Sequence, residues 1–298
     1  MMQKKLALKS SHHFTKILKK TNQFLRYTKF FYKKKLNTDV KKTKIENITI
    51  LSAFKDLEIL DFQIEYISKF IDFRNIYLIT PRAADVSSKF RNLITVIEDR
   101  EVVTELEKKQ FFDKCSESSR FPASWYYQQF LKLVHLDRIG IEDTFYIDAD
   151  TIPLRPPEIF FKRLLVVPAT DEYHYQYFDF IESYAFEINK NHLRNSHIPH
   201  FCYFQNSFLM EIESLLSKKG LSLKKMVLGA CQSNSYFSEF ELYNQFLLNF
   251  HSDQCIEKHY NGINLARTEK NMKRTVKLGH FSYASFHHWK KEKVLPFF

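Results

Sequence analysis

The chain has 298 residues, 44% of them hydrophobic, which suffices for one large folded domain with a buried core. Its net charge of +11 is concentrated at one end, because residues 1–45 contain 14 Lys and Arg against one acid, Asp39. The rest is close to neutral, which argues against a broad basic groove for nucleic acid. The five glycines stand too far apart for a glycine-rich phosphate loop.

Targeting and redox signals are few. The four cysteines show no Cys-x-x-Cys spacing, which favours a reduced cytoplasmic compartment. No run of about 18 apolar residues is present, so no membrane-spanning helix is expected. The basic start lacks the apolar core and cleavage site of a secretory signal, so secretion is not expected either.

Residues 1–45 are expected to form a basic amphipathic extension and linker. From Phe14 onward apolar residues recur at helical spacing, with lysines between them. Such a helix can dock on an anionic membrane surface, or it can pack its phenylalanine stripe on the chain's own domain. The sequence leaves both readings open. The first would place the protein at the inner face of the inner membrane as a peripheral protein.

Residues 46–298 are expected to form a single domain. Short apolar runs predict strands at residues 48–53, 76–79, 93–97, 145–147 and 164–167, with helices at residues 56–71 and 125–138. Strands alternating with helices indicate a mostly parallel sheet. Later in the chain we expect a helix at residues 177–189, a strand at 201–210, and helices at 211–218 and 238–250.

Polar residues follow the first four predicted strands, where a parallel sheet collects its ligands. They are Asp56, Arg82, Glu98 with Asp99, and Asp148 with Asp150. The strongest local signal is the last pair, in the segment TFYIDADTIPLRP at residues 144–156. Two carboxylates one residue apart in an extended segment can share a hard cation such as Mn²⁺ or Mg²⁺. A turn-capping role is the alternative, and the apolar strand before the pair favours the metal site.

Haloacid-dehalogenase-type phosphatases also carry Asp-x-Asp after a strand. Ile152 stands where they require Thr or Val, and no Gly in this chain precedes an Asp. The sequence therefore argues against that class.

The segment YIDADTIPLRP, preceded by WYYQQFLKL, resembles the corresponding region of bacterial glycosyltransferases of the GT-A fold. FSEFELY at residues 237–243 is similar to a segment of an uncharacterised group of them linked to surface polysaccharides. The resemblance covers about residues 46–298. It implies a Rossmann-like three-layer α/β/α domain, and a divalent metal at Asp148 and Asp150 around Ala149. It also implies a nucleotide-sugar donor, expected to be UDP-linked, and a lipopolysaccharide, capsular or other glycan or glycolipid acceptor.

FSEFELY offers two carboxylates. Ser238 and Glu241 have the spacing of a helix capping box, which explains both without catalysis. Glu239 is not needed for the box, so it is the favoured general base for the acceptor hydroxyl. Glu241 is the second candidate, and capping alone remains open for both.

Two further sets of residues are candidates for the donor site. GHFSYASFHHW, at residues 279–289, is partly similar to the C-terminal His segment that closes the metal site in the lipopolysaccharide galactosyltransferase-like branch. This similarity proposes His280 as a metal ligand, with His287 as the second choice. The alternative is that His280 is an ordinary surface histidine without a metal. Gln128 and Lys132, four residues apart on one helix, are candidates to contact donor phosphate or sugar.

Two other functions compete with glycosyl transfer. A metal-dependent nucleotidyltransferase also pairs carboxylates at strand ends, but it would carry a Gly-, Lys- and Arg-rich loop near the first strand, where ILSAFKDLE stands. A non-enzymatic protein that binds nucleic acid through residues 1–45 is the second. The neutral body of the chain counts against it.

Overall fold

The computed structural model describes residues 42–90, 92–115, 121–171, 173–188, 195–274, 278 and 280–287. The predicted N-terminal helix and its two possible roles lie outside the described residues. No helix in the described part of the chain is long and apolar enough to cross a bilayer.

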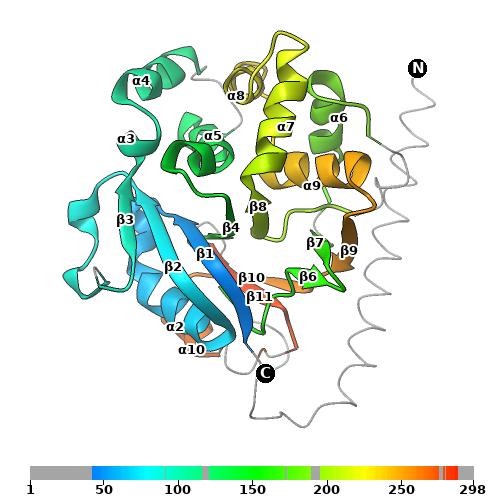
Figure 1. The fold of residues 1–298 in the computed structure, drawn as a ribbon. Helices are drawn as coiled ribbons and strands as arrows, with labels where there is room; N and C mark the ends of the chain where they lie inside the picture. Colours follow the sequence, from blue (N-terminus) through cyan, green and yellow to red (C-terminus); the bar gives the residue numbers. More distant parts are fainter. Residues whose placement is uncertain are drawn as a thin grey trace. The chain divides into compact units, whose positions relative to one another are not determined.

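The central sheet has five strands in the order β3-β2-β1-β4-β8 (Figure 1). Four strands run parallel, and β8 pairs antiparallel with β4. Their bounds are β1 (Thr43–Leu51), β2 (Ile71–Thr80), β3 (Thr95–Glu98), β4 (Asp143–Asp148) and β8 (Phe201–Gln205). Ile48 and Ile50 of β1 are fully buried, as expected for a strand covered on both faces. The predicted mixed α/β class with a mostly parallel sheet is confirmed.

Two three-stranded sheets lie beside the central one. In the first, β11 (Tyr283–His287) pairs with β10 (Gly262–Ala266) and with β5 (Thr151–Pro153). In the second, β7 (Leu164–Ala169) lies between β6 (Phe160–Phe161) and β9 (Cys255–His259). The strand predicted at residues 164–167 therefore exists, but in a small sheet of its own and not in the central one.

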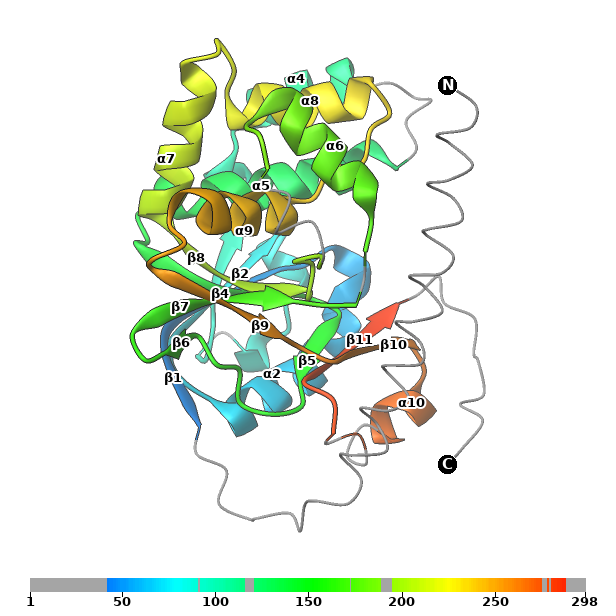
Figure 2. The same cartoon turned by 90° about the vertical axis from the view of Figure 1, so that its right-hand side faces the viewer.

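Helices lie on both sides of the central sheet (Figure 2). One side carries α2 (Leu60–Phe70) and α10 (Glu269–Arg274). The other carries α4 (Glu105–Lys114), α5 (Ala123–Ile139), α6 (Tyr175–Tyr184), α7 (Asn206–Ser217), α8 (Leu223–Gln232) and α9 (Glu239–Phe250). The short turns are η1 (Phe54–Ile59), η2 (Ala83–Asp85), η3 (Ser88–Phe90) and α3 (Asp99–Val102).

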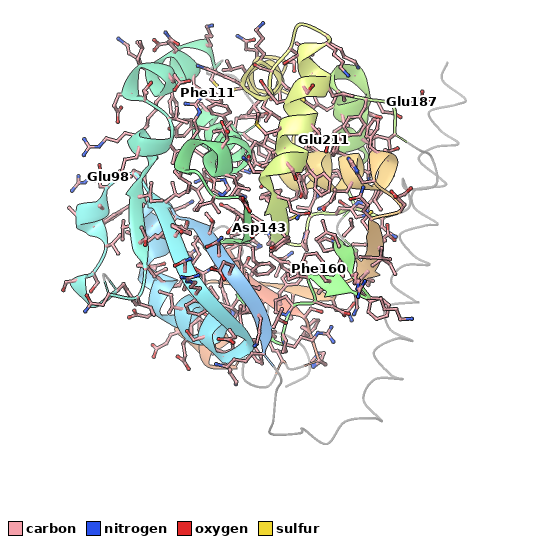
Figure 3. All side chains as sticks on the ribbon, in the orientation of Figure 1. Glu98, Phe111, Asp143, Phe160, Glu187 and Glu211 are labelled. Atoms are coloured by element: carbon pink, nitrogen blue, oxygen red, sulfur yellow. The ribbon has the colours of Figure 1, made fainter. Side chains whose placement is uncertain are left out.

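Aromatic side chains fill much of the space between the helices. Phe111 of α4 is fully buried, and its ring lies 5.8 Å from Phe130 and 5.6 Å from Tyr127 of α5 (Figure 3). Such ring pairs stabilise the packing beyond the area that they bury. These rings pack α4 against α5, the helix that leads to the Asp-x-Asp strand.

Several predicted bounds were wrong. Strand β1 begins at Thr43, within the expected linker, because β2 offers it partners from Ile71 onward. The strand predicted at residues 201–210 ends at Gln205, opposite Asp143, where its partner β4 begins. Without a partner strand the chain turns into helix α7 at Asn206. The helix predicted at residues 177–189 ends at Tyr184.

Candidate active site

The carboxyl ends of the parallel strands meet at one edge of the central sheet. Leu51 of β1 lies beside both Ile79 of β2 and Asp148 of β4, and Thr80 lies beside Glu98 of β3. The polar residues that follow these strands in the sequence therefore gather along this edge. In sheets of this kind the edge is the usual ligand site.

Asp148 is the last residue of β4 and is held by the side chains of Lys132 and His200. One carboxylate oxygen lies 2.6 Å from Lys132 Nζ, and the other lies 3.1 Å from His200 Nδ1. The Asp148 amide also donates to the carbonyl of His200 at 2.9 Å. Burial alone would raise the pKa of Asp148, but Lys132 and His200 outweigh it and lower the pKa to about 2. Asp148 is therefore ionised at neutral pH.

Lys132 joins Asp148 to Glu239 of α9. Its ammonium donates to each carboxylate at 2.6 Å, and it lies 5.0 Å from the ring of Tyr146 and 4.6 Å from that of Phe240. Burial opposes the charge of Lys132, but the two carboxylates hold its pKa well above the usual range. The cation is thus fixed at the centre of the cluster.

Glu239 is buried, with 1% of its surface exposed. Its pKa is raised, because burial and the negative charge of Asp148 together exceed the opposing effect of Lys132. The ion pair with Lys132 would by itself lower the pKa of Glu239, whereas burial and the charge of Asp148 raise it. One ammonium shared between two buried carboxylates neutralises only one of them, so the pKa of Glu239 stays raised. Glu239 is then the member of the cluster that takes up a proton first.

Gln129, which follows the predicted donor-site residue Gln128, lies against Glu239. The Glu239 amide donates to Gln129 Oε1 at 3.4 Å. With its side-chain amide turned by half a rotation, Gln129 donates to the Glu239 carboxylate. Gln128 is half-buried on the adjacent position of α5.

Asp150 is held by the strand β11. Its carboxylate lies 3.0 Å from His287 Nδ1, and its carbonyl accepts from the amide of Phe286 at 2.7 Å. His287 Nε2 lies 3.0 Å from Asn264 Oδ1. If Nε2–H donates to Asn264, a neutral His287 turns its Nδ1 lone pair toward the Asp150 carboxylate. In that arrangement a metal cation would find an oxygen and a nitrogen ligand side by side.

The two halves of the site face each other. The rings of His200 and His287 lie 5.5 Å apart, so Asp148 with His200 and Asp150 with His287 converge. Gln63 of α2 fixes the loop between them, because its amide donates to the carbonyls of Asp148 at 2.7 Å and Thr151 at 2.8 Å. No local sequence pattern marks Gln63, since it lies on a helix distant in the sequence.

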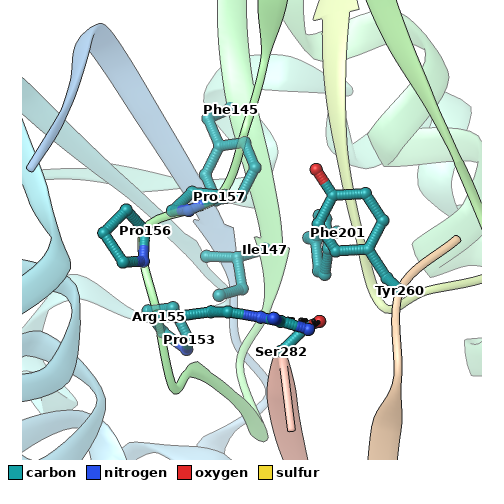
Figure 4. Close-up of a pocket in the computed structure, with 9 residues that line it drawn as sticks. All are labelled: Phe145, Ile147, Pro153, Arg155, Pro156, Pro157, Phe201, Tyr260 and Ser282. Atoms are coloured by element: carbon teal, nitrogen blue, oxygen red, sulfur yellow. Dashed lines mark hydrogen bonds between the residues drawn. The ribbon is translucent and has the colours of Figure 1, made fainter. Parts of the chain in front are cut away.

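Arg155 holds the segment that follows the Asp-x-Asp pair. Its guanidinium donates to the hydroxyl of Ser282, which immediately precedes β11 (Figure 4). It does so at the edge of a small pocket lined by Phe145, Ile147, Pro153, Pro156, Pro157, Phe201 and Tyr260. This contact and the pairing of β5 with β11 bring Asp150 and His287 together.

The donor set suits a divalent metal in part. Among the described residues, no group of three or more His, Cys, Asp or Glu is placed to hold a metal ion. Asp150 and His287 are adjacent and offer oxygen and nitrogen ligands, while the oxygens of Asp148 are engaged by Lys132 and His200. A metal fits at Asp150 and His287 when further oxygen ligands come from a substrate.

His280, the predicted metal ligand, lies in the turn before β11. Its ring lies 4.2 Å from that of Phe281. Burial, with the nearby charge of Arg155, lowers the pKa of His280. The second choice, His287, is the histidine that the structure brings to Asp150.

The other predicted donor residues have protein partners at the same edge. Asp56 lies 2.6 Å from Arg267, and the buried Asp99 lies 2.8 Å from Lys108. Arg82 is largely exposed and lies 3.1 Å from Asp85. Ala149 is buried between the two aspartates of the motif.

Glu241 belongs to a separate buried cluster. Its carboxylate accepts from Ser196 Oγ at 2.8 Å and from the His197 amide at 2.9 Å, and it lies 3.1 Å from His197 Nδ1. His197 Nε2 lies 3.0 Å from Glu257 of β9. Burial disfavours a charged His197, but the two carboxylates prevail and raise its pKa to about 9. The cluster therefore ties the segment before β8 to α9 and β9.

Ser238 caps α9 as its spacing predicted. Its hydroxyl accepts from the Glu241 amide at 3.2 Å. The Glu241 side chain instead points into the cluster around His197.

No known family model matches the chain, and no curated protein matches it. Among solved structures, it is similar to the galactosyltransferase LgtC in complex with donor and acceptor sugar analogues. The TM-score is 0.42 at 10% sequence identity, over 80% of this chain and 86% of that chain. A similarity at this level carries no conclusion about function.

Proposed function

We propose that the chain is a glycosyltransferase, which moves a sugar from a nucleotide-sugar donor to a carbohydrate or glycolipid acceptor. One observation carries the proposal: the Asp-x-Asp pair follows a strand of a mostly parallel sheet, and its second carboxylate lies 3.0 Å from His287. Carboxylate and imidazole ligands at such an edge suit a metal diphosphate. The donor is proposed to be UDP-linked, and the acceptor a lipopolysaccharide, capsular or related surface glycan.

In this proposal Asp150 and His287 would hold Mn²⁺ or Mg²⁺. His287 thus replaces His280, which the sequence favoured as the histidine ligand. When bound, the metal would neutralise charge on the diphosphate leaving group. Lys132 and His200 keep Asp148 ionised and fixed in orientation beside it. Gln63 keeps the loop from moving when the donor binds, because it holds the backbone on both sides of Asp150.

Glu239 is proposed as the general base. A carboxylate with a raised pKa accepts a proton more readily near neutral pH, which suits removal of the acceptor hydroxyl proton. Because Glu239 is 1% exposed, the acceptor hydroxyl can reach it only if neighbouring side chains move. If Glu239 acts only through Lys132, it is a positioning residue. Glu241 is engaged by His197 and serves to hold the fold.

The first test is a nucleotide screen by thermal shift, with and without Mn²⁺. A ligand that binds only the folded state must raise the melting temperature. The proposal expects a nucleoside diphosphate or nucleotide sugar to stabilise the protein with Mn²⁺ and much less without it. Stabilisation by a nucleoside triphosphate alone would favour the nucleotidyltransferase reading instead.

Residues 1–45 extend the proposal to location. A basic segment that precedes in sequence a domain proposed to build surface glycans suits an enzyme held at the inner leaflet, where lipid-linked acceptors are available. We therefore propose peripheral association with anionic lipid through this segment.

A further inference from the structure

The hairpin between β6 and β7 presents an unusual tip. Phe160 and Phe161 pair with Leu165 and Leu164, and only Lys162 and Arg163 connect the strands. Phe160 is 50% exposed and Phe161 is 39% exposed, and both turn residues are exposed. The ring of Phe160, labelled in Figure 3, lies 5.5 Å from that of Tyr203, and Phe160 also lines a pocket with Arg163 and Phe208.

The turn residues are poorly suited to the backbone that they adopt. Lys162 has φ 50° and Arg163 has φ 73°, so both lie in the left-handed region. Two-residue hairpins with this geometry strongly favour Asn-Gly, because a longer side chain strains the backbone there. Local turn chemistry therefore does not explain Lys and Arg at these positions. Strain of this kind concentrates where side chains have a function.

The tip also combines apolar surface with positive charge. Lys162 Nζ lies 5.4 Å and Lys258 Nζ 5.9 Å from the centre of the Phe161 ring. Lys258 is paired with Glu158, and Lys162 and Arg163 are both exposed at the turn. Exposed aromatic rings flanked by cations are typical of surfaces that enter the headgroup layer of an anionic bilayer.

We propose that the tip formed by Phe160, Phe161, Lys162 and Arg163 docks on an anionic membrane surface. The rings would enter the headgroup region and the two cations would bind lipid phosphates. Other occupants suit the tip less well. Residues 1–45 are strongly basic and would repel it, and so would a second copy of the same tip. The inference does not depend on the reaction that the protein catalyses.

The first experiment places a fluorescent residue at the tip itself, so that membrane binding through residues 1–45 does not mask the result. Phe161→Trp in the full chain is mixed with phosphatidylglycerol vesicles that carry a brominated lipid quencher. Leu106→Trp on α4 is the matched control, since Leu106 is 66% exposed. The proposal expects a blue shift and quenching for Phe161→Trp and neither for Leu106→Trp. Equal responses of the two variants, or no response in either, would overturn the proposal. A blue shift of Phe161→Trp that appears without vesicles and depends on protein concentration would also overturn it, because it would indicate that a second copy of the chain covers the tip.

The second experiment separates binding from folding. Lys162→Asn with Arg163→Gly gives the turn its favoured residues and removes both charges. The expected result is an equal or higher melting temperature and about a tenfold or greater loss of affinity for phosphatidylglycerol vesicles, since each cation near the surface contributes. The loss should shrink as salt is raised. Unchanged affinity at low salt, with the turn intact, would contradict the proposal.

Discussion

The ammonium nitrogen of Lys132 lies 2.6 Å from the carboxylate of Glu239, and both side chains are buried. The same nitrogen lies 2.6 Å from Asp148. One cation therefore connects α5, the end of β4 and the start of α9. The position of the Asp-x-Asp pair and the ionisation of Glu239 both depend on this contact.

Lys132→Met should destabilise the fold at neutral pH, because it leaves two buried carboxylates without their cation. Removing one partner of a buried ion pair costs about 3–5 kcal/mol. Denaturant unfolding should show this loss at pH 7, and the loss should shrink as the pH is lowered, because the raised pKa of Glu239 lets that carboxylate take up a proton first. Lys132→Arg keeps the charge and is the control. A Lys132→Met protein as stable as the wild type at pH 7 would show that the cluster is not ionised as described.

Glu239→Gln should lower turnover by roughly 10²–10⁴-fold with little change in melting temperature, as expected for loss of a general base. Gln retains the volume and can still accept from Lys132. Steady-state assays over a range of pH provide the measurement. If Glu239 only positions Lys132, the loss should be much smaller and the acidic limb of the pH profile should remain unchanged.

Glu241→Gln should do the reverse, with stability lowered and turnover per folded molecule retained. The substitution leaves the His197 cation with Glu257 alone, and loss of a charged hydrogen bond of this kind costs roughly 1.5–3 kcal/mol. Melting temperature and activity are measured on the same sample. A fully folded but inactive Glu241→Gln protein would assign the base to Glu241.

The His197 cluster predicts a loss of stability in alkaline solution. Folding raises the pKa of His197 from 6.5 to about 9, so its contribution is full below pH 6.5 and is lost as the pH rises through 9. This shift corresponds to a contribution on the order of 3 kcal/mol. Unfolding free energies measured from pH 6 to 10 should fall in the wild type by more than in His197→Gln. Parallel pH dependence in the two proteins would place a neutral imidazole in the cluster.

Much of the fold and of the candidate site follows from local sequence. Apolar runs that end in polar residues located β1 to β4, and the resulting parallel sheet gathers Asp56, Arg82, Asp99 and Asp148 at one edge. The Ser238 spacing likewise located the start of α9. These features depend on periodicity and on residues close in the sequence.

The partners of the site could not be predicted in this way. Gln63, Gln129 and His200 acquire their contacts from tertiary packing, and their own sequence contexts carry no signal for it. His287 and His280 stand on the same segment, and only the pairing of β11 with β5 decides that His287 faces Asp150. Glu241 has the spacing of a capping residue, but His197, distant in the sequence, draws its side chain away.

His287→Ala should weaken Mn²⁺-dependent nucleotide binding, and His280→Ala should leave it nearly unchanged. His287 adjoins Asp150, whereas His280 lies before the strand, beside Phe281. Calorimetric titration with a nucleoside diphosphate and Mn²⁺ measures both variants. Equal losses of affinity in the two variants would contradict the preference for His287. A loss confined to His280→Ala would identify His280 as the metal ligand.

The most direct test of the proposed function is the fate of a nucleotide sugar. The wild-type protein and Asp150→Ala are incubated with Mn²⁺ and a panel of nucleotide sugars, and the released nucleotide is identified by chromatography. The proposal predicts that the wild type consumes a UDP-sugar and releases UDP, and that a folded Asp150→Ala loses nearly all of this activity. Consumption of no nucleotide sugar, equal turnover by Asp150→Ala, or release of a nucleoside monophosphate in place of the diphosphate would contradict it.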